Sequence, residues 1–168
     1  GCTEVAIAGV VAYAAALRIA QFHTSNEFGD WDTALHTFTF AQAVHQGMRR
    51  VRPAGPDELY PPLMRGVFDA AMSLYLDRFL NIPPARLPEP DGTVAWDPNV
   101  LLTELPRLLD RQQQVDEAAR LVAGHLYIGG SARDLLRALG RALLREDRDF
   151  HTIQCVEAAY RLYRQLGD

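Results

Sequence analysis

The chain has 168 residues and a formal net charge of −4, with 21 acidic residues against 17 basic ones. This length fits one domain with a sizeable hydrophobic core. The acidic balance argues against nucleic acid as a partner, because proteins that bind it carry a basic surface. All 17 basic side chains are arginine, which excludes chemistry that needs a lysine, such as a Schiff base or a P-loop.

The remaining bulk features indicate a protein of the reducing cytoplasm. Cys2 and Cys155 are too few for a disulfide framework and have no metal-ligand spacing. The apolar run 5–20 is short for a membrane span, contains Arg18, and lacks the charged segment that precedes the core of a signal peptide. We therefore expect no membrane partner. The first residue is Gly1, not Met, which indicates a processed chain or a domain cut from a longer one.

Three helices are predicted in the first half of the chain. The first covers about 5–26, is stopped by Gly29, and has a narrow face of small residues that lets another helix approach closely. Asp30 or Asp32 caps the second, which extends to about residue 50 and is apolar on several sides, as expected of a central helix. A third helix covers 61–80. The narrow face of the first helix consists of Ala8, Ala12, Ala15, Ala16 and Ile19.

The second half begins with a proline-rich segment, about 81–98, which predicts an ordered loop and not a helix. Helices follow over 101–112 and 115–127, with an interruption at Pro106.

A pair of glycines then breaks the chain, and Ser131 caps an amphipathic helix over 132–144. From there the chain either continues as one long helix towards residue 166 or bends near Asp147. No segment alternates apolar and polar residues for long enough to predict a sheet. The predicted fold is all-α: a single-domain bundle of six to seven helices over 1–168, with the proline-rich loop around 81–98.

Three histidine–carboxylate pairs at i, i+4 spacing are the main candidates for a functional site. On a helix this spacing places both side chains on one face, where a carboxylate orients an imidazole and raises its basicity. The pairs are His23 with Glu27, Asp32 with His36, and Asp147 with His151.

Position along the helices predicts that two of these pairs face the interior. His23 continues the stripe of Ala12, Ala16 and Ile19, while Asp147, His151 and Gln154 continue that of Leu136, Leu139 and Leu143. Burying such groups is costly unless they are paired or bound to a ligand. The short 27–31 connection places His23 and His36 at the same end of a helical hairpin. His151 reaches that end only if the last helix packs against this pair.

Structural explanations compete with the functional one. Asp30, Asp32 and Asp147 stand where helix caps belong, and capping alone accounts for them. His45 fits a core histidine and His125 a helix-end histidine. Cys155 follows His151 by one helical turn, yet a single cysteine in an apolar helix is usually a packing residue. Ferritin-like Glu-x-x-His repeats, His-Glu-x-x-His and a nucleophile elbow are all absent from the sequence.

Three segments carry a resemblance to known proteins: FHTSNEFGDWDTALHTFTFAQAVHQ, GVFDAAMSLYLDRFLNIPPARLP and LLREDRDFHTIQCVEAAYR. They resemble a helical region of bacterial proteins that also carry a Rieske-type 2Fe–2S domain, and more distantly the questin-oxidase-like family. The Rieske ligand pairs Cys-x-His and Cys-x-x-His do not occur in this chain, so it cannot hold that cluster itself. The resemblance implies an association with electron transfer supplied by another domain or protein, and it assigns no residue roles.

These observations lead to two hypotheses. In the first, the bundle is a redox enzyme, or the helical part of one, that oxygenates a small organic substrate with a transition metal such as iron. Its metal ligands or acid–base groups are His23, His36 and His151, with Glu27 as a further ligand and Asp32, Asp147 and Gln154 in support. In the second, the bundle is a non-catalytic interaction or small-molecule-binding module, in which the histidines are structural. Both hypotheses leave open whether the protein forms oligomers.

Overall fold

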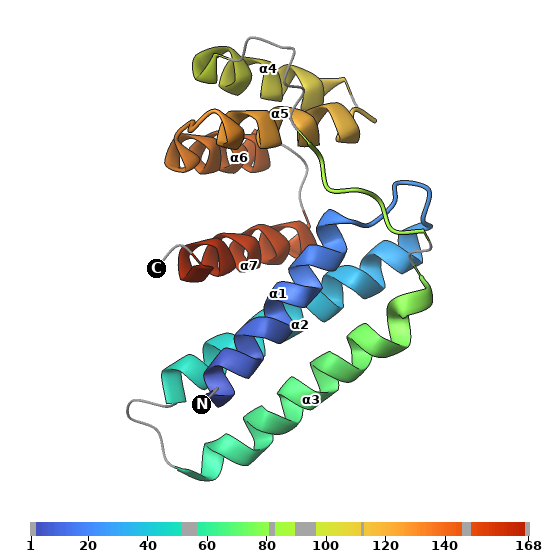
Figure 1. Cartoon of the computed structure of the whole chain (residues 1–168), viewed down its shortest axis with the longest axis vertical. Coiled ribbons are helices and arrows are strands. Elements are labelled where there is room, and N and C mark those ends of the chain that lie inside the picture. Colours follow the sequence, from blue (N-terminus) through green and yellow to red (C-terminus); the bar gives the residue numbers. More distant parts are fainter. Residues whose placement is uncertain are drawn as a thin grey trace. The chain divides into compact units, whose positions relative to one another are not determined.

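The computed structural model describes residues 3–51, 57–80, 83–89, 97–111, 113–145 and 149–166. Within these ranges the chain forms seven α-helices, two short 3₁₀ helices and no strand, which confirms the predicted all-α class and helix number (Figure 1). The helices belong to two compact units. Residues 1–85 and 150–168 make up unit 1, and residues 86–149 make up unit 2.

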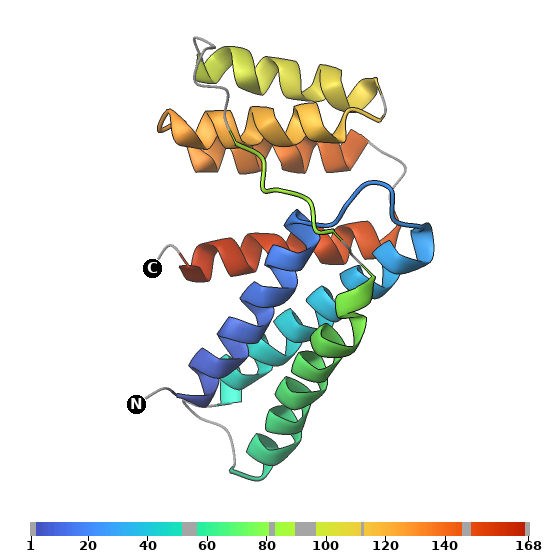
Figure 2. The ribbon, with the colours of Figure 1, turned by 45° about the vertical axis from the view of Figure 1, so that its right-hand side comes forward.

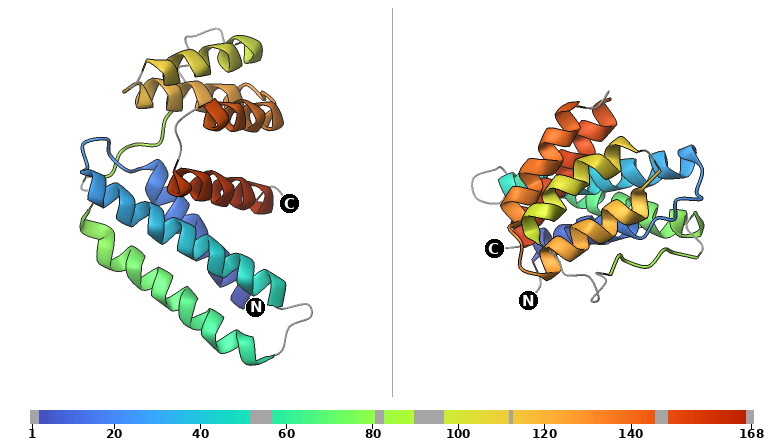
Figure 3. Two further views of the ribbon diagram at one scale, coloured as in Figure 1. Left: turned by 180° about the vertical axis from the view of Figure 1, so that it is seen from behind. Right: turned by 90° about the horizontal axis from the view of Figure 1, so that it is seen from above.

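Unit 1 is a bundle of four α-helices with α2 at its centre. Its helices are α1 (Glu4–Ala20), α2 (Phe28–Val51), α3 (Tyr60–Leu76) and α7 (Phe150–Leu166), with 3₁₀ helices at Asp57–Leu59 and Asp77–Phe79. The first three run side by side, and α7 lies across α1 and α2 (Figures 2 and 3). Because α2 contacts α1, α3 and α7, its predicted central position is confirmed.

Small side chains let these helices approach closely. Ala8, Ala12 and Ala15 of α1 are buried, as the narrow face predicted. Alanine has the highest helix propensity and adds little bulk, so it favours both the helix and its close packing. Unit 1 contains two clusters of buried core residues, which are Ala12, Ala15, Phe38, Ala41, Ala70, Ala158 and Leu162, and Ala8, Val44, Met48 and Val67.

The connection between α1 and α2 differs from the prediction. α1 ends at Ala20, well before residue 26, because Phe22 leaves the helix and is buried against Trp31, with ring centroids 4.7 Å apart at 71°. This tertiary contact overrides the local helical preference of the segment. The prediction that Gly29 ends the first helix is also wrong, since Gly29 lies in the first turn of α2.

The far end of α1 is tied to α3. Arg18 donates to the backbone carbonyls of Leu74, at 3.2 Å, and Asp77. Pro61 lies in the first turn of α3, where its missing N–H costs nothing. The third helix therefore begins where predicted, and its last predicted turn is the 3₁₀ helix at Asp77–Phe79.

Unit 2 consists of α4 (Pro98–Asp110), α5 (Val115–Tyr127) and α6 (Ala132–Arg145). The predicted interruption at Pro106 is wrong, because α4 continues through it. Proline removes one backbone hydrogen bond, but Leu105 and Leu108 beside it are buried and hold the helix in place. The predicted Ser131 cap is confirmed, since its hydroxyl accepts from the N–H of Asp134 at 3.2 Å.

Two predictions concern the segments that join the units. The long-helix alternative is wrong, because α6 ends at Arg145 and α7 begins at Phe150 in the other unit. Asp147 lies outside the described residues. Of the proline-rich loop, residues 83–89 are described and form neither helix nor strand, while 81–82 and 90–96 lie outside the described ranges. None of the described helices combines the length and apolarity needed to cross a bilayer.

Candidate metal centre

Asp32 and His36 occupy the first turns of α2 and face the same side. Their Oδ1 and Nε2 atoms lie 3.7 Å apart, which confirms the predicted i, i+4 pairing. The arrangement depends on α2 having begun at Phe28, so that both residues are already within regular helix.

His151 joins this pair from the start of α7. Its Nδ1 lies 3.1 Å from Nε2 of His36, and the two ring centroids are 4.8 Å apart. Ala158 and Leu162 of α7 share one core cluster with Phe38 of α2, and this packing fixes α7 along the helix that carries His36. The ring of Phe150 packs on that of His151, with centroids 3.8 Å apart. The last helix therefore packs against the helix that carries His36, which is the condition under which His151 was expected to reach His36.

Asp32, His36 and His151, here called the two-histidine cluster, have the donor set and spacing of a metal site. Each offers one ligand atom, and these atoms all lie within 4.8 Å of one another. Two ligands about 2.1 Å from one metal ion, at about 90–110° to each other, lie about 3.0–3.4 Å apart. The two separations given above, 3.1 Å and 3.7 Å, are close to that range. No other group of this kind occurs among the described residues.

Partial exposure gives this cluster an open side. Asp32 and His151 are half-buried, while His36 is exposed. Three protein ligands that leave further positions accessible are typical of catalytic rather than structural metal sites.

His23 and Glu27 do not belong to the cluster. Both are exposed, and both lie in the connection between α1 and α2, where i, i+4 residues no longer share a helix face. Nδ1 of His23 accepts from the backbone N–H of Ser25 at 3.1 Å and lies 2.6 Å from the Ser25 hydroxyl. The predicted interior position of His23 is wrong because α1 ends before reaching it.

Gln154 lies in a groove that adjoins the cluster. The groove, called the α2–α7 groove below, has a volume of about 570 Å³, and its lining includes His36, Phe40 and Ile153. Gln154 is exposed, so its predicted interior position is also wrong, but it lines the groove with His36. A cavity of this size with apolar walls and a few polar groups is typical of small-molecule sites.

Sequence reasoning missed one residue of this groove, Gln42. It is only 2% exposed, and neither its amide nitrogen nor its amide oxygen has a hydrogen-bond partner among the described residues. The available signal was its place on the buried stripe of α2, between Phe38 and Ala41 on one side and His45 on the other. An unpaired amide at such a position destabilises the fold unless water or a ligand satisfies it.

The other candidates have structural surroundings. His45 is buried in the core as predicted. His125, buried in the last turn of α5, has its Nε2 3.1 Å from the carbonyl oxygen of Ser131, which agrees with a helix-end role. Burial raises the pKa of the Cys155 thiol, and this side chain packs against the core cluster, which favours the packing interpretation over a thiolate nucleophile.

Fold and site together define an α-helical bundle that carries a candidate three-ligand metal centre beside a groove. No protein-family model matches the chain, and no curated protein or solved structure is similar enough to count as a match.

Proposed function

We propose that unit 1 binds iron(II) at the two-histidine cluster and oxygenates a small organic molecule held in the α2–α7 groove. The observation that carries this proposal is the convergence of two imidazole nitrogens and one carboxylate oxygen beside a groove that His36 helps to line. Two histidines and one carboxylate with open positions are the ligand set of many non-haem iron oxygenases. The iron would supply oxygen activation and electron transfer.

The chain's own residues would hold the metal and the substrate. Neutral His36 and His151 would present ring nitrogens to the metal, and Asp32 would balance one of its positive charges. In the groove, the unpaired amide of Gln42 would hydrogen-bond a polar group of the substrate. The walls around Phe40 and Ile153 would cover its apolar part.

The proposed oxygenation needs an electron donor. Inserting one atom of O₂ into a C–H bond gives an alcohol and a water molecule, and it consumes two electrons and two protons. The resemblance noted in the sequence motivates a Rieske-type 2Fe–2S domain or protein as the donor.

Metal binding is the first test, with tag-free protein reconstituted anaerobically with Fe(II) and desalted. We expect about one equivalent of iron in the wild type and little in His36→Ala or His151→Ala, because each variant lacks one of three ligands. His23→Ala is the matched control, since this exposed histidine lies outside the cluster, and it should keep its iron. Less than about a tenth of an equivalent in the wild type would overturn the proposal.

One observation favours the second, non-catalytic function. His36 and His151 form a ring–ring hydrogen bond that joins α2 to α7, as a purely structural pair would. If the pair is structural, a His36→Gln, His151→Gln double variant should lose thermal stability while the wild type shows no metal uptake. If the pair is a metal site, the same variant should lose metal with a smaller change in the melting temperature of the metal-free protein.

A further inference from the structure

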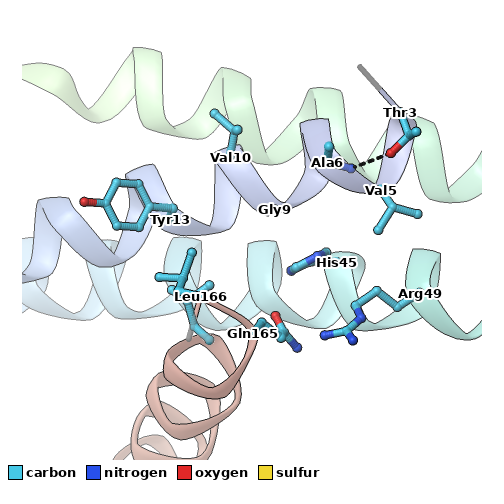
Figure 4. Close-up of a pocket in the computed structure, with 11 residues that line it drawn as sticks. Thr3, Val5, Ala6, Gly9, Val10, Tyr13, His45, Arg49, Gln165 and Leu166 are labelled. Atoms are coloured by element: carbon cyan, nitrogen blue, oxygen red, sulfur yellow. Dashed lines mark hydrogen bonds between the residues drawn. The ribbon is translucent and has the colours of Figure 1, made fainter. Parts of the chain in front are cut away.

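A second cavity of unit 1 lies between α1, α2 and α7 and has a volume of about 510 Å³ (Figure 4). It shares no lining residue with the α2–α7 groove and contains no residue of the two-histidine cluster. This cavity is therefore a different site from the proposed metal centre and its groove.

His45 is one of the residues that line this cavity. Its side chain is 7% exposed, and its Nδ1 is buried without a hydrogen-bond partner. The ring lies against α1 at Gly9, where an added Cβ would come within 3.3 Å of both Cε1 and Nε2 (Figure 4). A glycine at this point leaves room for the imidazole, and a buried ring nitrogen without a partner costs stability unless something binds it.

Two further polar side chains lie beside His45: that of Gln165, and that of Arg49, which is exposed to solvent as Arg50 is. Gln165 of α7 has a buried amide oxygen with no hydrogen-bond partner, and its side chain lies next to that of Arg49 from α2 (Figure 4). Among the described residues, Arg49 has no carboxylate within ion-pair distance, and the cavity lining includes no Asp or Glu. Among the described lining residues there is thus one positive charge, that of Arg49, and there are two buried atoms without a hydrogen-bond partner, Nδ1 of His45 and the amide oxygen of Gln165.

The charge of the lining defines the kind of ligand. Burial, and secondarily Arg49, lower the pKa of His45 below its ordinary value, so its ring is neutral at neutral pH. Of the lining residues that the structure describes, Arg49 is then the one that carries a charge, and it matches one negative charge. Val5, Val10 and Leu166 provide an apolar wall for an organic tail.

We propose that this cavity binds a small organic monocarboxylate. Its carboxylate accepts hydrogen bonds from the Arg49 guanidinium and from a ring N–H of His45, and its tail lies along Val5, Val10 and Leu166. A guanidinium presents paired N–H donors in the geometry of a carboxylate. A hydroxyl or N–H group next to the carboxylate would satisfy the amide oxygen of Gln165.

The experiment is an NMR titration of the ¹⁵N-labelled full chain with hexanoate. We expect saturable shifts of amide signals along α1 near Gly9 and along α7 near Gln165. Hexanamide, which has the same tail without the charge, and adipate, which has a second charge at the tail, should bind at least about tenfold more weakly. The proposal would be overturned if hexanamide bound as tightly as hexanoate. It would also be overturned if hexanoate gave no saturable shifts, or bound with a Kd above about 10 mM.

Variants locate the site. Arg49→Gln should weaken hexanoate binding about tenfold or more, whereas Arg50→Gln, which removes the adjacent exposed arginine outside the cavity, should bind like the wild type. Leu166→Glu is a second variant that should weaken hexanoate binding, because it places a negative charge in the exposed part of the cavity wall, where it repels the carboxylate. His36→Ala should leave hexanoate binding unchanged, so this proposal and the metal proposal can fail independently. Equal loss of binding in Arg49→Gln and Arg50→Gln would contradict a specific site.

Discussion

Replacing Gln42 with leucine should stabilise the ligand-free protein. Gln42 is 2% exposed, and both polar atoms of its amide are buried without a partner. A buried unsatisfied polar group costs about 1–3 kcal/mol, and leucine removes both such groups while keeping a similar volume. Because the branched side chain fits the site imperfectly, we expect a net gain of about 2 kcal/mol. The same change should abolish the substrate binding that we propose for the α2–α7 groove.

Urea unfolding followed by helical circular dichroism measures this effect. The midpoint should rise with little change in slope, which would show that stability and not the denatured state has changed. Gln154→Leu is the matched control, since Gln154 lines the same groove but is exposed, and it should change stability by no more than about 0.5 kcal/mol. A lower midpoint for Gln42→Leu would show that the amide has partners in the folded chain and would refute the reasoning.

Three further changes test the structure. Gly130→Ala should destabilise unit 2 by about 2–4 kcal/mol, because the added Cβ would lie 2.5 Å from the backbone oxygen of His125. Hydrogen exchange of the amides of α5 and α6 measures this change. Unchanged exchange would contradict the close approach of Gly130 to His125. Burial, and secondarily Arg49, lower the pKa of His45, so this residue contributes stability that is present above about pH 6.5 and is lost as the pH falls below that value. His45→Gln should therefore weaken the fall in melting temperature between about pH 6.5 and 5. If the fall stays equally steep in the variant, other groups cause it. Thr3→Ala removes the side-chain cap of α1 and should cost about 1 kcal/mol in thermal unfolding, whereas Thr3→Ser should cost little.

Local sequence signals predicted most of the helices. The bounds of α5 and α6, and the small-residue face of α1, follow from glycine breaks, capping residues and helical periodicity. The errors occur where tertiary contacts outweigh local preference. Phe22 leaves α1 because Trp31 buries it, and Pro106 stays within α4 because its neighbours are buried. Neither contact can be read from a single segment.

The candidate site shows the same limit. The Asp32–His36 pair is local to one helix, so its spacing alone predicted it. The contribution of His151 depends on how α7 packs, and the sequence left that condition open. His23 was assigned to the interior only because α1 was predicted too long. Gln42 was missed because a single polar residue on an apolar stripe gives no signal of whether it is paired.

The division into two units has a consequence for the order in which the candidate metal centre forms. Asp32 and His36 come before unit 2 in the chain, and His151 comes after it, 115 residues beyond His36. During synthesis, α1, α2 and α3 emerge first with two of the candidate ligands, and the third is made only after residues 86–149. Since domains fold largely as units during synthesis, the centre is assembled last, when α7 docks on α2. A chain that stops after α6 would keep the Asp32–His36 pair and lack the ligand that completes the centre.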